Sequence, residues 1–170
     1  MKILLANKFF YPKGGDCVHT IGLKQLLEER GNKVALFSMQ HPENLQNEYN
    51  LHWPSNVEFN SKKNNKITEK VLRPLGSHEV KRKWNALIDQ FEPDIVHLQN
   101  IHSQLSPIIA KEAYKRGIPV FWTLHDFKLI CPAYSMLRNG KPCEKCLTSK
   151  INVVKYRCLK NSFSASMLAF

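Results

Sequence analysis

The chain alternates short apolar segments with longer amphipathic ones, and this alternation restricts the fold more than any other feature. Four segments have the length and composition of buried strands: residues 2–6, 33–39, 94–98 and 119–124. Repeated strand–helix alternation with short connections is the signature of a doubly wound parallel sheet. We therefore predict an α/β fold with a Rossmann-like parallel sheet, followed by a Cys-rich loop.

Helix signals fill the gaps between these strands. One predicted helix begins at Asp16 as its N-cap and stops at Gly31, with an apolar face of Ile21, Leu23, Leu26 and Leu27. A second begins after Ser77, and its buried face consists of Val80, Trp84, Leu87, Ile88 and Phe91. A third follows Ser106 and Pro107 and stops at Gly117.

The region between residues 40 and 77 gives weaker signals. Residues 40–66 are polar and Asn-rich, which predicts a long connection with one short strand at 56–59. A helical pattern starts at residues 67–72, and Arg73-Pro74-Leu75-Gly76 is expected to interrupt it.

Charge and length set the broad class. The 170 residues suffice for one α/β domain, and 25 Lys and Arg against 14 Asp and Glu give a net charge of +11. Such a surface favours anionic partners, including an anionic membrane surface, although solubility alone explains it equally well. MKILLANKFF has no signal-peptide pattern and no run reaches the roughly 18 apolar residues of a membrane span. We expect a cytoplasmic protein, in contact with the inner face of the membrane, with reduced cysteines.

A glycine pair, Gly14-Gly15, lies between the first strand and the first helix. Backbone amides at a helix N-terminus are a usual place for an anionic group. The pair is not a G-x-G-x-x-G motif, and the second strand ends in Ser38-Met39-Gln40 without an acidic residue, so we expect no NAD site. A plain turn is the alternative explanation for the two glycines.

Polar side chains follow the third and fourth strands. Asn100, Ile101 and His102 lie in the loop after the third strand, and His125-Asp126 end the fourth. Ligands of open α/β sheets bind outside the carboxyl ends of the strands, so we predict that these loops and Gly14-Gly15 share one edge. His97 falls inside a strand and is expected to be a core histidine.

Four cysteines follow the last strand, at Cys131, Cys143, Cys146 and Cys158, with a C-x-x-C in the middle. Four thiolates can bind Zn²⁺ tetrahedrally, so a structural zinc site is one interpretation. Reduced thiols packed in a core, or disulfides formed in air, are the alternatives. A thioredoxin-like redox site is not expected, and Cys17 is expected to be a small core residue.

Two stretches resemble retaining glycosyltransferases of family 4. The first, FFYPKGGDCVHTIGLKQLLEERGNKVALFSM, contains a Tyr-Pro-x-Gly-Gly loop. The second, PDIVHLQNIHSQLSPIIAKEAYKRGIPVFWTLHDFKLICPAYSMLRNGKPCEKC, has His-Asp after the PVFWTL strand and then Cys-Pro. The ending Arg157-Cys158-x-Lys160-x-Ser162 is similar to the same branch of the family. The resemblance covers nearly the whole chain and is weakest over residues 40–66.

The resemblance implies a role for each of these residues. Family members are two-domain GT-B enzymes whose N-terminal half mainly binds the acceptor, with a nucleotide sugar in the cleft between the halves. Gly14 and Gly15 would approach the donor diphosphate, and His125 would contact the transferred sugar. Asp126 would lie beside His125, and the loop Asn100–His102 would border a glycan or lipid-linked acceptor. The family transfers sugar with retention and without a catalytic metal ion.

One part of the family pattern has no counterpart in the sequence. The second Rossmann-like domain, which carries most of the nucleotide contacts, is not found in residues 1–170. We expect the chain to be the N-terminal, acceptor-side domain of an enzyme of cell-surface polysaccharide synthesis, inactive by itself. The alternative is a zinc-stapled basic module that binds nucleic acid. That alternative would require Lys and Arg interleaved with exposed aromatic residues, and no such pattern is visible, so we expect no nucleic-acid partner.

Overall fold

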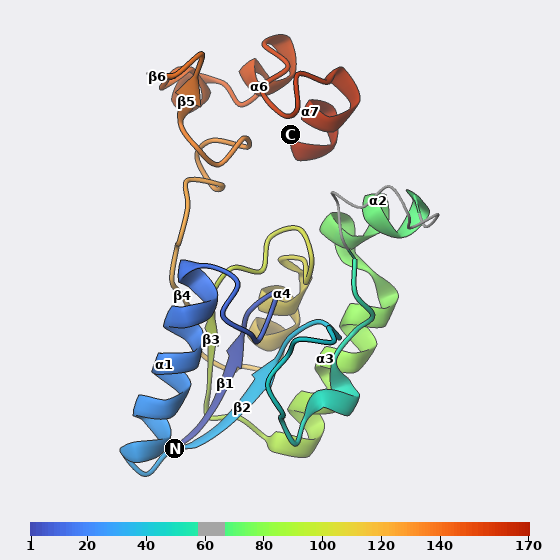
Figure 1. Cartoon of the computed structure of the whole chain (residues 1–170). Helices are drawn as coiled ribbons and strands as arrows, with labels where there is room; N and C mark the ends of the chain where they lie inside the picture. Colours follow the sequence, from blue (N-terminus) through green and yellow to red (C-terminus); the bar gives the residue numbers. More distant parts are fainter. Residues whose placement is uncertain (58–66) are drawn as a thin grey trace. The chain divides into compact units, whose positions relative to one another are not determined.

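A computed structural model gives the structure of residues 1–57 and 67–170 (Figure 1). The chain divides into two compact units, Met1–Thr123 and Leu124–Phe170, here named the first and the second unit. Each unit has its own apolar core, and each is described by itself.

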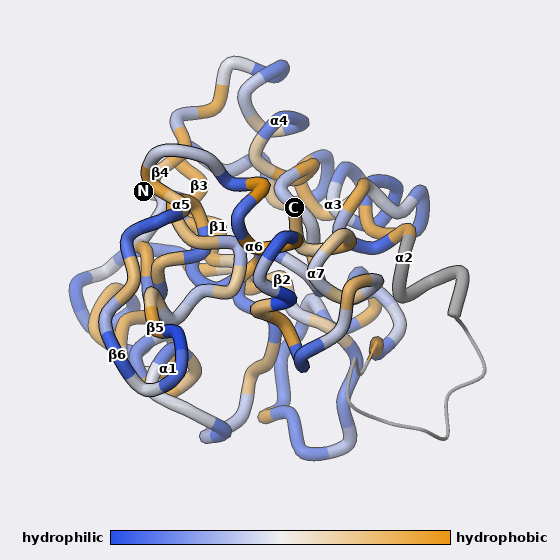
Figure 2. The backbone as a smooth tube through the Cα atoms, turned by 90° about the horizontal axis from the view of Figure 1, so that it is seen from above, coloured by the Kyte–Doolittle hydropathy of each residue, from blue (hydrophilic) through white to orange (hydrophobic). Residues whose placement is uncertain are grey.

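A four-stranded parallel sheet with strand order β2-β1-β3-β4 forms the centre of the first unit, as predicted. Its strands are β1 (Lys2–Ala6), β2 (Lys33–Phe37), β3 (Ile95–Leu98) and β4 (Val120–Trp122). Leu4 of β1 lies between Ala35 of β2 and Val96 of β3, and all three side chains are fully buried. Figure 2 shows β1 and β3 in the colours of hydrophobic residues. Such nearly continuous apolar composition is typical of parallel strands covered on both faces.

Three helices connect these strands: α1 (Gly15–Glu29), α3 (His78–Phe91) and α4 (Ile108–Lys115). Figure 1 shows α1 on one side of the sheet and α3 on the other, and α4 packs beside α3. The predicted buried face of α3 is confirmed, since Val80, Trp84, Leu87, Ile88 and Phe91 are its buried residues. Trp84 meets Phe37 of β2 edge to face, with 4.9 Å between ring centroids.

The first helix differs from its prediction in two respects. Its N-cap is Gly14, two residues earlier than predicted, so Asp16 lies in the first turn and is not the cap. Its buried residues are Cys17 and Thr20, whereas Leu26 is 46% exposed. The face turned to the sheet follows the three- and four-residue spacing from Cys17, and Leu26 lies off that stripe.

The connection between β2 and α3 is irregular but anchored. It contains the short 3-10 helix η1 (Asn50–His52), after which the fully buried Trp53 donates a hydrogen bond from Nε1 to the Leu36 carbonyl (2.8 Å). The strand predicted at 56–59 is not formed at residues 56–57, and its other half lies outside the described residues.

The interruption predicted at residues 73–76 was wrong, because α2 (Ile67–Gly76) continues through Pro74. The proline lies in the last turn, and the hydroxyl of Ser106 donates a hydrogen bond to its carbonyl (3.1 Å). Arg73, immediately before it, is fully buried and binds the Glu79 carboxylate (2.7 Å) and the Ser55 carbonyl (3.0 Å). These tertiary bonds hold the end of α2 where local propensity predicts a break.

The second unit is not the simple Cys-rich loop that was predicted. It contains a two-stranded antiparallel hairpin and three short helices: β5 (Leu137–Arg138), β6 (Lys141–Pro142), α5 (Lys145–Thr148), α6 (Asn152–Lys155) and α7 (Phe163–Ala169). Its core consists of Cys131, Ala133, Val153 and Val154. Within residues 1–57 and 67–170, no helix has the length and apolar character needed to cross a membrane.

Candidate functional site

The carboxyl ends of β1 and β3 form the natural ligand-binding edge of the first unit. The chain leaves β1 toward β2 on one side, while β3 lies on the other side of β1, so this is the topological switch point of the sheet. The loop after β1 and the loop after β3 are bonded to each other there. Asn100 donates its backbone N–H to Oδ1 of Asn7 (3.1 Å), and Lys8 donates its N–H to the Asn100 carbonyl (3.1 Å).

The loop after β1 is held in one conformation by its aromatic residues. Tyr11 stacks on His41, with 4.6 Å between ring centroids, and Phe9 meets both rings edge to face. Asn44 accepts a hydrogen bond from the Phe10 N–H (3.0 Å) and donates one to the Met39 carbonyl (2.7 Å). The loop that leads to the glycine pair is therefore fixed against the chain after β2.

Gly14 and Gly15 lie at the start of α1, on the edge where they were predicted. No side chain in the described part of the chain caps the helix at Gly14. The Cys17 amide bonds to the Gly14 carbonyl (3.0 Å), which leaves the amides of Gly15 and Asp16 for another acceptor. A Cβ added at Gly15 would meet no atom within 4 Å, and one at Gly14 would meet Asp16 Oδ1 at 3.4 Å. Packing within the chain thus does not require a glycine at Gly15.

An ion pair next to the glycines was missed by the sequence argument. Lys8 Nζ lies 3.3 Å from Asp16 Oδ2, and both side chains are mostly buried. A carboxylate in the first turn interacts favourably with the positive end of the helix dipole. Lys8 is the second residue after β1, and its place beyond the carboxyl end of a strand was the signal that could have identified it. The α1 amides therefore offer partial positive charge to an anion, and the Lys8 ammonium, whose charge Asp16 balances in this structure, lies beside them.

The predicted loop Asn100–His102 lies at the same edge. Ile101 is fully buried in the core, so its side chain supports the loop and does not face a ligand. His102 packs against Trp122 of β4, with 5.0 Å between ring centroids, and Trp122 donates its Nε1–H to the Gln99 carbonyl (2.8 Å). The structure therefore brings Asn100, His102, Gly14 and Gly15 to one edge of the first unit.

His97 is anchored inside the sheet, as predicted. Its Nε2 lies 2.8 Å from the Thr123 hydroxyl, which extends the pairing between β3 and β4. The N–H of Thr123 also bonds to the Leu98 carbonyl (2.9 Å), one residue past the end of β4 at Trp122. His97 therefore has a structural role in the sheet.

His125 and Asp126 belong to the second unit, just after Thr123, and both are half-buried. Asp126 Oδ1 accepts the backbone N–H of Lys128 (2.9 Å), which fixes a tight turn. Burial lowers the pKa of the Lys128 amine, and the neighbouring Asp126 carboxylate partly opposes this effect. Lys128 Nζ donates a hydrogen bond to the Pro132 carbonyl (2.6 Å), so the turn after His125 is held by contacts among neighbouring residues.

The four clustered cysteines are free thiols that influence one another. Burial raises the pKa of Cys146 and of Cys158, and their cysteine neighbours act in the same direction. Cys131 lies in the small core of the second unit, with Cys146 and Cys158 packed against it. Within residues 1–57 and 67–170, no group of three or more His, Cys, Asp or Glu residues is arranged to hold a metal ion. The predicted structural zinc site is therefore not supported, and three of the four thiols lie in or against the small core: Cys131, Cys146 and Cys158.

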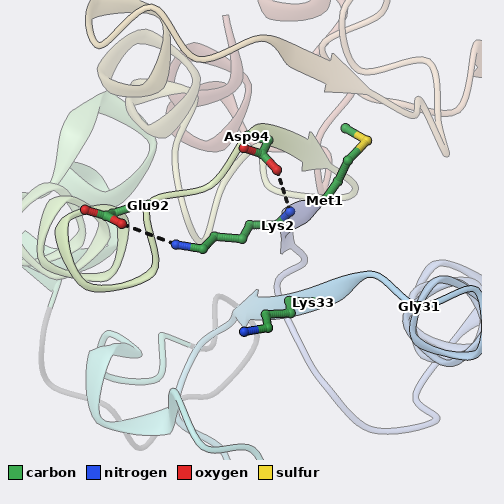
Figure 3. Close-up of a pocket in the computed structure, with 6 residues that line it drawn as sticks. All are labelled: Met1, Lys2, Gly31, Lys33, Glu92 and Asp94. Atoms are coloured by element: carbon green, nitrogen blue, oxygen red, sulfur yellow. Dashed lines mark hydrogen bonds and ion pairs between the residues drawn. The ribbon is translucent and has the colours of Figure 1, made fainter.

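A hollow of the first unit lies at its opposite edge. Figure 3 shows it at the amino ends of the strands, where Lys2 bridges to Glu92 (3.2 Å) and its backbone N–H bonds to Asp94 (2.7 Å). Its volume is about 520 Å³. Parallel sheets bind ligands at the carboxyl ends of their strands, so we place the candidate site at the other edge.

Comparison with known proteins identifies the family of the chain. The sequence pattern of Glycosyltransferase Family 4 matches residues 13–145, which include the glycine pair, the Asn100–His102 loop and His125. No curated protein matches the chain. Because the match covers well over half of the sequence, the chain belongs to glycosyltransferase family 4.

Proposed function

We propose that the chain is the N-terminal, acceptor-side half of a two-domain GT-B enzyme that transfers sugar from a nucleotide-sugar donor with retention. Its acceptor is a glycan or lipid-linked sugar of cell-surface polysaccharide synthesis. Membership of the family favours glycosyl transfer over the alternative of a nucleic-acid-binding module. The proposal also places the enzyme at the cytoplasmic face of an anionic membrane, where a lipid-linked acceptor would lie.

The observation that carries this proposal is the environment of Gly15. Its backbone is helical, nothing in the described chain lies within 4 Å of an added Cβ, and it precedes the unsatisfied amides of α1. Alanine is the better helix former, by about 1 kcal/mol. Gly22 shares these two properties, so Gly15 is distinguished by its place at the start of α1, beside open amides, where we infer close approach of a ligand. We assign that ligand as the donor diphosphate, with Lys8 supplying further positive charge.

In this mechanism the first unit supplies binding energy and orientation. The amides of α1 and Lys8 would hold the diphosphate leaving group, whose negative charge grows as the glycosidic bond breaks. The loop Asn100–His102 would border the acceptor. His125 would support the positive charge that develops at the reacting carbon, and Asp126 would order the turn that carries it.

The test compares two alanine substitutions in the same helix. Gly15→Ala and Gly22→Ala each add one methyl group to α1, and neither methyl meets an atom within 4 Å. Both variants should fold at least as stably as the wild type. Only Gly15→Ala should weaken binding of nucleoside diphosphates, by about tenfold or more, the size expected for losing a hydrogen bond to a charged group.

Binding is measured on this chain by amide chemical shifts, and turnover on the two-domain enzyme. The anomeric proton of the product, observed by NMR, reports retention or inversion. Equal diphosphate affinity in the two variants would remove Gly15 from the donor site, and an inverted product would exclude the proposed mechanism.

A further inference from the structure

The second unit carries an excess of positive charge that the proposed transfer does not use. It contains eight Lys and Arg residues but two acidic residues, Asp126 and Glu144, which gives it a net charge of +6. This is more than half of the +11 of the whole chain. An excess of this size within one small unit costs free energy through self-repulsion.

Three of these cations gather around one aromatic ring. The Arg138 guanidinium lies 4.2 Å from the centre of the Tyr156 ring, and the Lys145 and Lys155 amines lie 5.6 and 5.7 Å from it. Cation–π contact orders the Arg138 side chain. In the described part of the chain, none of these three cations forms a salt bridge with a carboxylate.

The hairpin adds a fourth cation in an unfavourable position. Strands β5 and β6 pair antiparallel, and Arg138 lies directly opposite Lys141. Like charges at directly opposite positions destabilise a hairpin. The turn between them, Asn139-Gly140, has positive φ at both residues (52° and 75°), the geometry of a tight two-residue hairpin turn. The hairpin therefore holds two cations together in a fixed register.

A hollow of about 400 Å³, here named the hairpin pocket, is lined by Arg138, Lys141 and Lys145 together with the residues between them. Arg138 and Lys141 come from the hairpin and Lys145 from the start of α5. The backbone N–H of Cys143, between them, bonds to the Met136 carbonyl (2.8 Å) and fixes the path of the chain. Glu144 also lines the pocket, so three cations face one carboxylate and two positive charges remain.

We propose that the hairpin pocket binds a phosphate-bearing ligand through Arg138, Lys141 and Lys145. A planar guanidinium donates two parallel hydrogen bonds to phosphate oxygens, and lysine ammonium groups add point charges. Two unbalanced positive charges match a dianionic phosphate or diphosphate group. The bound anion would offset the repulsion between Arg138 and Lys141.

The probe for this site is inorganic pyrophosphate, titrated into the whole chain and followed by amide chemical shifts. The amides of residues 138–145 should shift, and the affinity should fall as salt is added. The test variant is Lys141→Ala/Lys145→Ala, which leaves Arg138 on Tyr156. The matched control is Lys111→Ala/Lys150→Ala, which removes the same charge from two exposed lysines that do not line the pocket.

The test variant should bind pyrophosphate at least about tenfold more weakly, whereas the control should stay close to the wild type. Arg138→Lys keeps the positive charge but loses the planar guanidinium that donates two parallel hydrogen bonds. Its affinity for pyrophosphate should lie between those of the test variant and the control. The proposal is overturned if the amides of 138–145 do not shift, or if both double variants lose affinity equally. These amides report separately from that of Gly15, so failure here and failure of the donor site are distinguishable.

Binding to lipid vesicles distinguishes a lipid headgroup from a soluble molecule as the source of the phosphate. Wild-type protein is sedimented with vesicles of phosphatidylcholine alone and of equimolar phosphatidylcholine and phosphatidic acid, with and without pyrophosphate. Sedimentation with phosphatidic acid that pyrophosphate and the test variant abolish supports a lipid headgroup. Binding of pyrophosphate without sedimentation supports a soluble ligand at the same site.

Discussion

The backbone N–H of Asn100 donates a hydrogen bond to the side-chain oxygen of Asn7 across 3.1 Å, joining residues far apart in the sequence. The Nδ2 group of Asn7 donates in turn to the Phe9 carbonyl (3.0 Å) and to the Cys17 sulfur (3.6 Å). One fully buried amide thus connects the two site loops and α1. The candidate site is held together by a side chain that takes no part in the proposed chemistry.

Asn7→Leu should therefore destabilise the first unit. Leucine has a similar volume, so the main effect is that the Asn100 N–H and the Phe9 carbonyl lose their partner in a buried place. We expect a loss of about 2 kcal/mol in the free energy of unfolding, measured in urea. Asn50→Leu, at an exposed position, is the control and should change little. A variant as stable as the wild type would show that the two loops do not depend on Asn7.

The buried Arg73–Glu79 pair should make stability depend on acidity. Burial alone would raise the pKa of Glu79, but hydrogen bonds from Ser55 and the charges of Arg73 and Lys83 outweigh it and lower that pKa. A carboxyl with a lowered folded-state pKa stabilises the protein above its unfolded-state pKa. That contribution is lost as the pH falls from about 4.3 through the folded-state value.

Glu79→Gln tests this link by removing the charge. At neutral pH it should lower the free energy of unfolding by about 3 kcal/mol, because the fully buried Arg73 loses its counter-charge. It should also flatten the decline in acid relative to the wild type, both followed by urea unfolding across pH. Glu43→Gln, at an exposed position, is the control. An equally steep acid decline in Glu79→Gln would assign the effect to other carboxylates.

The fold could be predicted from the sequence because the signals for its strands and helices are local. The apolar runs of β1–β4 and the three- and four-residue spacing from Val80 to Phe91 are read within a single element. Arg73 shows the limit of such signals. Its contacts with Ser55 and Glu79 form only in the folded chain, and they carry α2 through Pro74 against local propensity.

The edge at which four of the candidate residues lie was predictable, and their contacts were less so. Strand ends located Gly14, Gly15, Asn100 and His102 at one edge, since parallel strands end together. Asn7 and Lys8 lie just beyond the end of β1, which was a signal for both, but their contacts with Asn100 and Asp16 form only in the folded chain. The cysteine spacing suggested zinc, but spacing alone does not separate thiols that bind a metal from thiols that pack in a core.

Cys17 should be the slowest of the cysteines to react in the folded protein. It is 1% exposed, and burial followed by the neighbouring Asp16 charge raises its pKa, so little of the reactive thiolate forms. With iodoacetamide at about pH 8, we expect labelling on the order of 10²-fold slower at Cys17 than at the half-buried Cys143, since it requires local opening. Peptide mass spectrometry measures both rates. Urea should abolish the difference, and equal rates without urea would place Cys17 outside the core.

His125 is the residue that we propose for the chemistry, and its substitution separates catalysis from folding. The residue is half-buried and lies three residues beyond the end of β4 at Trp122, not at the strand end as predicted, and the turn after it is fixed by the bond between Asp126 and the Lys128 N–H. Truncation to alanine should leave that turn and the core intact. In the two-domain enzyme, His125→Ala should lower kcat by on the order of 10²-fold, the size expected for one positioned electrostatic group.

His78→Ala, at an exposed position on α3, is the control. Circular dichroism and the melting temperature establish folding, and steady-state kinetics give kcat. Near-normal kcat in a folded His125→Ala protein would remove His125 from the reaction, whereas a variant that fails to fold would assign it a structural role.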